Sequence, residues 1–292
     1  MGSSRTAPLD LPVVAPVSPG IPATFVVPLD GSDLSLRAVP IAVSFAERFG
    51  ADVVAVTTPT TTDADDRLAS PVWLRDLAGD DHYRRLRVVV VDDDPVNAVS
   101  MQVAANHDSV VCMATHARGA IGTMALGSVA QEVLREVRVP VLLVGRHCGE
   151  ATFDSGPIVV CHDGSSAADA ILTPARAWAH HLDLPIVVVQ VYHPLDVPTA
   201  EDPTRAVRPV LDRLGPGAHA EVIASSFPAG AIRDLAHEID ASMIALSTHG
   251  RTGAARMVFG SVASWVTRES PCPVLTVRPP HLAHGTRAGA PS

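Results

Sequence analysis

The chain has 292 residues, a formal net charge of −9, 47% hydrophobic residues and 18% charged residues. This length fits two domains of ordinary size, and the acidic balance without a run of Lys and Arg excludes nucleic acid as the main partner. No apolar stretch approaches the ~20 residues of a membrane span, and no secretory signal pattern is present. We therefore expect a cytoplasmic protein that does not bind membranes.

Apolar runs alternate with helical patterns through the first half of the chain. Residues 1–21 are rich in proline and small residues and are expected to form a flexible leader. A helix is predicted over 36–49 because its apolar spacing ends at Gly50, with Pro40 in its first turns or at a kink. Further helices are predicted over 94–106 and 128–137. Strands are predicted over 25–29, 53–56, 88–91, 110–114 and 141–144; the polar stretch 57–85 gives no clear signal.

The second half repeats this order. Strands are predicted over 158–160, 186–191, 221–224, 243–246 and 274–277, with a polar linker over 147–155 before them and a flexible tail over 279–292 after them. The strands are apolar throughout rather than alternating, as expected when helices cover both faces of a parallel sheet. Strand–helix alternation of this kind predicts doubly wound α/β domains, in which ligands bind beyond the carboxyl ends of the strands.

The two halves also repeat their short motifs, always 133 residues apart. Asp30-Gly31-Ser32 returns as Asp163-Gly164-Ser165, and Thr115-His116 returns as Thr248-His249. Gly127-Ser128-Val129-Ala130 returns as Gly260-Ser261-Val262-Ala263. A repeat of this length is a whole domain rather than a solenoid unit. The sequence thus predicts two tandem α/β domains, over 22–146 and 156–278, each a Rossmann-like five-stranded parallel sheet sandwiched by helices.

A glycine-rich loop follows the predicted fourth strand of the second domain. It begins Ser247-Thr248-His249-Gly250-Arg251-Thr252-Gly253 and leads to Gly260-Ser261 at the start of a helix. Glycine allows the backbone to approach a ligand closely, and a helix N-terminus attracts anions. Ser261 can either cap this helix or donate its hydroxyl to a phosphate. Asp-Gly-Ser after the first strand is by itself most often a turn with a helix cap.

These motifs together resemble the universal stress protein family, over both halves of the chain. The marks are Asp-Gly-Ser after the first strand, Ser-Thr-His-Gly-Arg-Thr-Gly after the fourth, and Gly-Ser-Val-Ala before Pro-Cys-Pro-Val. ATP-binding members share a Gly-x2-Gly-x9-Gly-Ser/Thr pattern, which the second domain matches except for Ser247 in place of the first glycine. The resemblance implies an adenine nucleotide, ATP with or without Mg²⁺, as the ligand.

The resemblance also implies the contacts in the second domain. Asp163 and the backbone near Val191 would hold adenine and ribose, while the loop and helix start would hold the phosphates. The candidate residues of this loop and helix start are Ser247, Thr248, His249, Gly250, Arg251, Gly253, Gly260, Ser261 and Val262. His249 is more typical of a hydrogen-bonding or solvated residue than of a catalyst, and Arg251 is as well suited to solvent as to phosphate.

The first domain departs further from the pattern. Ala114 and Ala117 replace both loop glycines, although Asp30, Gly127, Ser128 and Val129 remain as candidates. The methyl group of an alanine reduces the space for a phosphate, and it disfavours positive φ at a cost of about 1 kcal/mol. The first domain either binds nucleotide more weakly or is a degenerate half kept for pairing.

Other chemistry has little support in the sequence. There is no P-loop, no Gly-x-Ser-x-Gly elbow and no metal-binding motif, and Asp92-Asp93-Asp94 is best interpreted as a solvated loop. The four cysteines form no CxxC pair and are expected to be buried free thiols.

Three functions remain open. The first is a stress-response switch or sensor that binds ATP, chiefly in the second domain. The second is an ATP-independent stress protein that acts through contacts with an unknown protein partner. The third is a slow ATPase, which ranks last because no obvious base is present. Family members commonly pair through the fifth strand, so the two domains are expected to form an internal pseudo-dimer that could associate into a homodimer.

Overall fold

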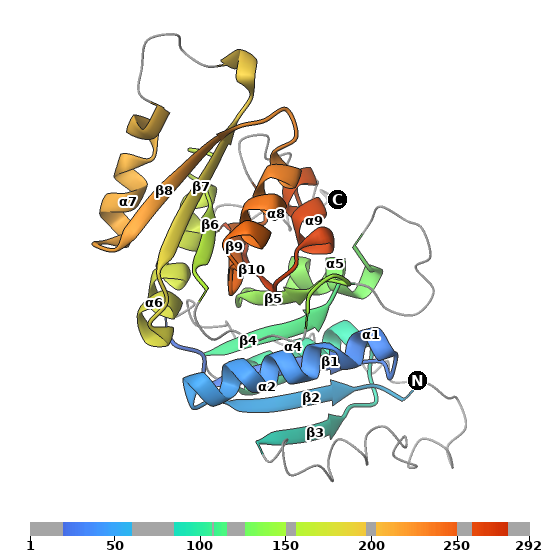
Figure 1. Cartoon of the computed structure of the whole chain (residues 1–292). Helices are drawn as coiled ribbons and strands as arrows, with labels where there is room; N and C mark the ends of the chain where they lie inside the picture. Colours follow the sequence, from blue (N-terminus) through green and yellow to red (C-terminus); the bar gives the residue numbers. More distant parts are fainter. Residues whose placement is uncertain are drawn as a thin grey trace, which may run out of the picture.

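The two halves of the chain share one ten-stranded sheet, which Figure 1 shows running from β3 at the bottom to β8 at the upper left. The computed structural model describes residues 20–59, 85–106, 108–115, 126–149, 156–196, 203–249 and 259–279. The strand order is β3-β2-β1-β4-β5-β10-β9-β6-β7-β8. Paired strands are parallel within each half, and β5 pairs with β10 in antiparallel fashion where the halves meet. The predicted tandem α/β fold is confirmed.

The first unit, from Thr24 to Val144, follows the predicted order of elements, with one helix divided. Its elements are β1 (Thr24–Leu29), α1 (Asp33–Leu36), α2 (Ala38–Phe49), β2 (Asp52–Thr57), β3 (Leu86–Val90), α4 (Pro95–Ala105), β4 (Ser109–Ala114), α5 (Ser128–Glu136) and β5 (Val141–Val144). The helix predicted over 36–49 is interrupted at Arg37. Pro40 lies in the first turn of α2, where backbone N–H groups have no intrahelical partner. Gly50 ends α2 with φ +68°, as predicted.

The second unit, from Ile158 to Val277, repeats this order of strands. Its elements are β6 (Ile158–Cys161), the 3-10 turn η2 (Ala168–Ile171), α6 (Leu172–Leu182), β7 (Ile186–Tyr192), the 3-10 turns η3 (Pro194–Asp196) and η4 (Pro203–Ala206), α7 (Arg208–Leu214), β8 (Ala218–Ala224), α8 (Pro228–Glu238), β9 (Met243–Ser247), α9 (Ser261–Glu269) and β10 (Val274–Val277). The expectation of apolar strands throughout is wrong for β8. This strand begins at Ala218 and exposes His219 and Glu221, because it lies at the sheet edge.

Helices cover both faces of the sheet, and the two faces are built differently. On one face, α2 of the first unit and α6 and α7 of the second share a single apolar core. On the other face, α4 with α5 and α8 with α9 form separate clusters. Phe259 is half-buried and packs against both of these clusters. The units are therefore joined through their cores as well as through the β5–β10 pair.

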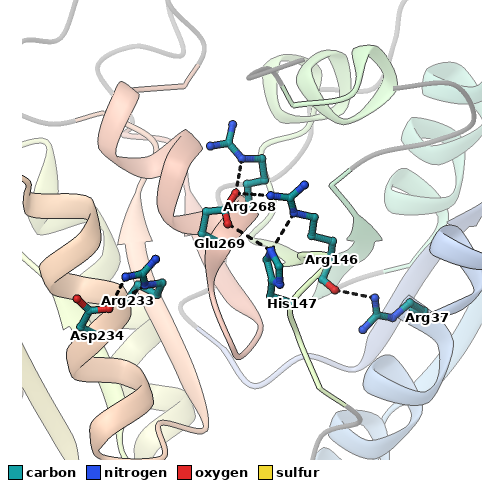
Figure 2. A network of polar contacts seen from close by, with 7 residues as sticks. All are labelled: Arg37, Arg146, His147, Arg233, Asp234, Arg268 and Glu269. Carbon is teal, nitrogen blue, oxygen red and sulfur yellow. Dashed lines mark hydrogen bonds and ion pairs between the residues drawn. The ribbon is translucent and has the colours of Figure 1, made fainter. Parts of the chain in front are cut away.

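A polar network closes the junction between the units, as Figure 2 shows. The Glu269 carboxylate of α9 accepts hydrogen bonds from Arg268 Nε at 2.8 Å and from Arg146 Nη2 at 2.9 Å. His147 Nε2 lies 3.3 Å from the other carboxylate oxygen. Arg37 donates to the carbonyl oxygens of Arg146 and Cys148. The chain that leaves β5 is thus fixed to helices of both units.

The cysteines are free thiols, in agreement with the prediction, and three of them are buried. Cys161 is half-buried. None of the helices in the described residues combines the length and apolar character that a membrane span needs.

Candidate functional site

The carboxyl ends of the strands in the first unit border a cavity of about 110 Å³. Its walls come from the ends of β1, β2 and β4 and from the starts of α4 and α5. The lining includes Leu29 and Asp30, Thr57 and Thr58, Ala114 and Thr115, Pro95 and Ala98, and Gly127 and Val129. The wall is largely apolar, with Asp30 as its acidic group. Three predicted site residues, Asp30, Gly127 and Val129, thus meet at one cavity.

The Asp-Gly-Ser motif folds in the same way in both units. Asp30 Oδ1 accepts hydrogen bonds from Ser32 N at 2.9 Å and from Ser32 Oγ at 2.6 Å. Asp163 Oδ1 accepts the corresponding bonds from Ser165 at 3.0 Å and 2.6 Å. The intervening glycines have φ of +75° and +83°, a region that glycine enters without strain. Each aspartate therefore shapes its own turn at the end of the first strand of its unit.

In both units, equivalent hydrogen bonds join the residue after the fourth strand to the N-cap residue of the following helix. Gly127 N donates to Thr115 O at 2.8 Å, and Gly260 N donates to Thr248 O at 2.9 Å. Each threonine N–H in turn donates to the last residue of the neighbouring strand, Val144 or Val277, at 3.0 Å. These bonds hold the first turn of α5 and of α9 beside the end of the fourth strand, where an anion would meet the helix N-terminus.

The structure shows whether Ser261 and its counterpart Ser128 cap their helices. Gly127 and Gly260 are the N-cap residues of α5 and α9, and neither cap has a side-chain hydrogen bond. Ser128 and Ser261 are the first helical residues and are exposed. Neither hydroxyl caps its helix. Each lies at the first turn, where it could donate a hydrogen bond to a bound phosphate.

The remaining predicted residues of the second unit lie around the same strand ends. Val191 is half-buried at the end of β7, and it corresponds to Thr58 of the first-unit cavity. Ser247 ends β9 and is buried. Thr248 Oγ1 lies 3.0 Å from His249 Nδ1, and both residues are buried. Val262 is 38% exposed. The predicted residues Gly250, Arg251 and Gly253 lie outside the described residues, as does Ala117 of the first unit.

Sequence reasoning missed three polar residues beneath the Asp163 turn. His162 Nε2 lies 3.0 Å from Asp169 Oδ1, and Arg213 Nη1 of α7 lies 2.6 Å from the same oxygen. Gly164 N donates to His162 Nδ1 at 3.1 Å. A comparison of the two copies could have found these residues. Leu29 and Leu36 of the first unit correspond to His162 and Asp169 of the second, so two apolar positions have become polar.

The described residues contain no group of three or more His, Cys, Asp or Glu side chains suited to a metal ion. The Asp92-Asp93-Asp94 segment has a local structural role. Asp94 Oδ1 accepts from Val96 N at 2.9 Å and so caps α4, while Asp93 Oδ1 accepts from Asn97 Nδ2 at 3.1 Å.

Comparison with known proteins places the fold and motifs in one family. A universal stress protein of Methanocaldococcus jannaschii is 32% identical over 80 residues, which are 27% of this chain and 46% of that protein. A universal stress protein of Mycolicibacterium smegmatis is 28% identical over 193 residues, 60% of this chain and 64% of that protein. The matches thus span less than two thirds of either relative.

The fold also matches a solved structure over almost its whole length. The crystal structure of a universal stress protein from Archaeoglobus fulgidus superposes with a TM-score of 0.64 at 21% identity and covers 90% of this chain and 98% of that one. The model of the universal stress protein family matches residues 23–145 and again residues 155–278. The chain therefore belongs to the universal stress protein family, and it contains two copies of the family's domain.

Proposed function

We propose that this chain binds an adenine nucleotide at the carboxyl ends of its strands and acts as a nucleotide-dependent switch or sensor in a stress response. ATP is the proposed ligand, held chiefly by the second unit. The observation that carries the proposal is the shared arrangement of an Asp-Gly-Ser turn and a helix with a glycine N-cap around the same strand ends in both units.

The first-unit cavity supports the adenosine part of this proposal. Its walls are largely apolar, and Asp30 lies at its edge. Ligand sites of this kind combine an apolar lining with a few polar groups that fix orientation. A volume of about 110 Å³ is below the ~300–1,000 Å³ typical of whole ligand pockets. The cavity therefore suits one ring of a ligand, with the rest lying along the start of α5.

The helix starts support the phosphate part. The first N–H groups of α5 and α9 carry the positive end of the helix dipole, and the N-cap residue of each helix is a glycine, which has no side chain to cap them. The exposed hydroxyls of Ser128 and Ser261 add a donor beside each. The second unit is favoured for ATP because its loop keeps Gly250, whereas the first unit has Ala117 there. A magnesium ion, if bound, would be held by the phosphates together with these hydroxyls.

The proposal is tested by calorimetric titration of the nucleotide-stripped full chain with Mg-ATP. One site per chain is expected, or one strong and one weak site. Gly260→Val should abolish the strong site, because the added side chain occupies the space of the phosphate. A Cβ at Gly260 itself meets nothing closer than Thr248 O at 3.5 Å, so the chain accommodates it. Gly127→Val is the matched control in the first unit and should leave the strong site intact.

Thermal unfolding of both variants establishes that they remain folded. Unchanged ATP affinity in a folded Gly260→Val chain contradicts the assignment of the strong site to the second unit. Absence of binding in the unmodified chain contradicts nucleotide binding altogether and favours an ATP-independent protein that acts through protein contacts.

A further inference from the structure

The two Asp-Gly-Ser turns have the same backbone hydrogen bonds, but the residue that precedes the aspartate differs between them. In the first unit the residue before Asp30 is Leu29, which is buried in the apolar core. In the second unit the corresponding residue is His162, whose side chain is 5% exposed. A buried imidazole costs free energy unless its ring nitrogens are satisfied. Both nitrogens of His162 have partners, and these partners fix the chemical form of the ring.

Hydrogen-bond roles determine where the proton of His162 lies. Gly164 N, a backbone donor, points at Nδ1 from 3.1 Å, so Nδ1 must offer a lone pair. Asp169 Oδ1 lies 3.0 Å from Nε2, and an ionised carboxylate can only accept, so Nε2 carries the hydrogen. The ring that fits this structure is therefore neutral and protonated at Nε2.

The carboxylate of Asp169 is held in its charged form. Burial raises its pKa, but the hydrogen bonds from His162 and Arg213 and the charge of Arg213 outweigh this effect, so the pKa lies below its ordinary value. Arg213 of α7 approaches Asp169 Oδ1 to 2.6 Å. The chain of contacts runs from α7 through Asp169 and His162 to the backbone of the Asp163 turn.

We propose that His162 is a positioning residue that holds the Asp163-Gly164-Ser165 turn only while its ring is neutral, so that acidification weakens the ligand site of the second unit and spares that of the first. Protonation places a hydrogen on Nδ1 and leaves two donors, Nδ1 and Gly164 N, facing each other. The turn must then shift, and the Asp163 carboxylate moves with it. This inference rests on the proposed nucleotide site.

The other charged groups near the ring do not oppose this switch. Asp169 on η2 and Asp163 next in the chain both attract an imidazolium, whereas Arg213 on α7 is already paired with Asp169. Arg176 of α6 donates to the backbone oxygen of Arg213. His249, in the loop after β9, is buried and titratable as well, so any test must separate its effect from that of His162.

The first measurement follows the ligand-free full chain by nuclear magnetic resonance from pH 8 to pH 5. The ¹⁵N shifts of the His162 ring should show the neutral Nε2–H form at pH 8. The amide resonance of Gly164 should move with the same midpoint as the ring, while that of Gly31 stays constant. A ring with its hydrogen on Nδ1, or a ring that titrates without moving the Gly164 amide, overturns the proposal.

The second measurement is an ATP titration read at the amides of Gly260 and Gly127, which report the two units separately. His162→Asn keeps an acceptor near the position of Nδ1 but cannot titrate, and it leaves His249 unchanged. When the pH is lowered from 8 to 5.5, the affinity measured at Gly260 should fall in the unmodified chain by a factor about fivefold larger than in His162→Asn. A fivefold change is what the loss of roughly one hydrogen bond produces.

His162→Leu places at this position the residue type that precedes the same turn in the first unit, Leu29. Its side chain cannot titrate, so its affinity at Gly260 should change with pH as little as that of His162→Asn. An equal loss on acidification in the unmodified chain and in His162→Asn overturns the proposal. Failure of ATP to bind at either amide contradicts the proposed function instead, and the titration of Gly164 in the ligand-free chain still decides the role of His162.

Discussion

Phe49 of the first unit packs against Trp178 of the second, with ring centroids 4.9 Å apart and planes tilted by 59°. Trp178 also faces Phe45 at 5.6 Å and Phe25 at 6.2 Å. The chain has few aromatic residues, 4% in all, and several of them gather at this contact between α2 and α6. Aromatic burial is therefore a principal stabiliser of the junction between the units.

Replacement of Trp178 tests this contact. Trp178→Ala removes a side chain that is 1% exposed, and the cavity should lower the free energy of unfolding by about 3–5 kcal/mol. The measurement is equilibrium unfolding in urea. Trp265→Ala on α9 is the matched control, because Trp265 is half-buried and away from this contact. A loss in Trp178→Ala no greater than that in the control contradicts the role assigned to the junction.

Glu269 makes the junction sensitive to acid. Burial raises its pKa, but the hydrogen bond from Arg268 and the charges of Arg146, Arg268 and His147 outweigh this and hold the pKa below its ordinary value. The stability it contributes is thus present above about pH 4.5 and is lost as the pH falls through the lowered pKa. Glu269→Gln should cost about 1–2 kcal/mol at pH 7 and little at pH 3.

Thermal unfolding of both chains between pH 3 and pH 7 measures this difference. The melting temperatures of the unmodified chain and of Glu269→Gln should become equal as the pH is lowered toward 3. Parallel curves would mean that Glu269 contributes only packing. Glu132→Gln, at an exposed ion pair with Arg135 on α5, is the control and should have no measurable effect.

The buried cysteines should be unreactive in the folded chain. Burial raises the pKa of Cys272 to about 11 and that of Cys148 to about 12, and it also raises the pKa of Cys112. Because only the thiolate reacts, a disulfide reagent at pH 8 should modify them at least about a hundredfold more slowly than in urea-unfolded chain. Fast modification before unfolding would contradict this burial.

The raised thiol pKa values also predict how the stability of the fold changes at alkaline pH. A thiol whose pKa is raised in the folded state favours folding below its ordinary pKa, so stability should fall as the pH rises from about 9 toward 11. Cys272→Ala should reduce this alkaline loss, and urea unfolding at pH 8 and pH 10 measures it.

The serines of the two turns offer a matched pair. Ser32 Oγ and Ser165 Oγ each donate to the preceding aspartate and accept from a backbone N–H three residues on, both at 3.2 Å. Ser32→Ala and Ser165→Ala should each lower the free energy of unfolding by about 1 kcal/mol, as loss of an N-cap does. Urea unfolding of the two single variants and of the double variant measures the losses. Losses that differ greatly between the variants would contradict the equivalence of the turns.

The sequence alone predicted the order of the strands, because apolar runs and glycine stops are local signals. It did not predict the helix α7, whose counterpart in the first half falls in the polar stretch 57–85 that gives no clear signal. Gly50 and the apolar strand 141–144 are examples, and both appear in the structure as predicted. The repeat of Asp30 as Asp163 likewise predicted that both turns would lie at a strand end. The division of the first helix at Arg37 and the early start of β8 were missed, since element ends depend on packing and on position in the sheet.

Only the tertiary structure decided which residues meet. The contact of Phe49 with Trp178 joins residues far apart in the chain, and no periodicity predicts it. The same holds for His162, which by itself in a sequence is an ordinary strand-end histidine. Its neutral form follows from Gly164 on one side and Asp169 with Arg213 on the other, and folding brings the guanidinium of α7 to that carboxylate. Sequence patterns specify which backbone forms, whereas the partners of a buried polar group are set by the packing around it.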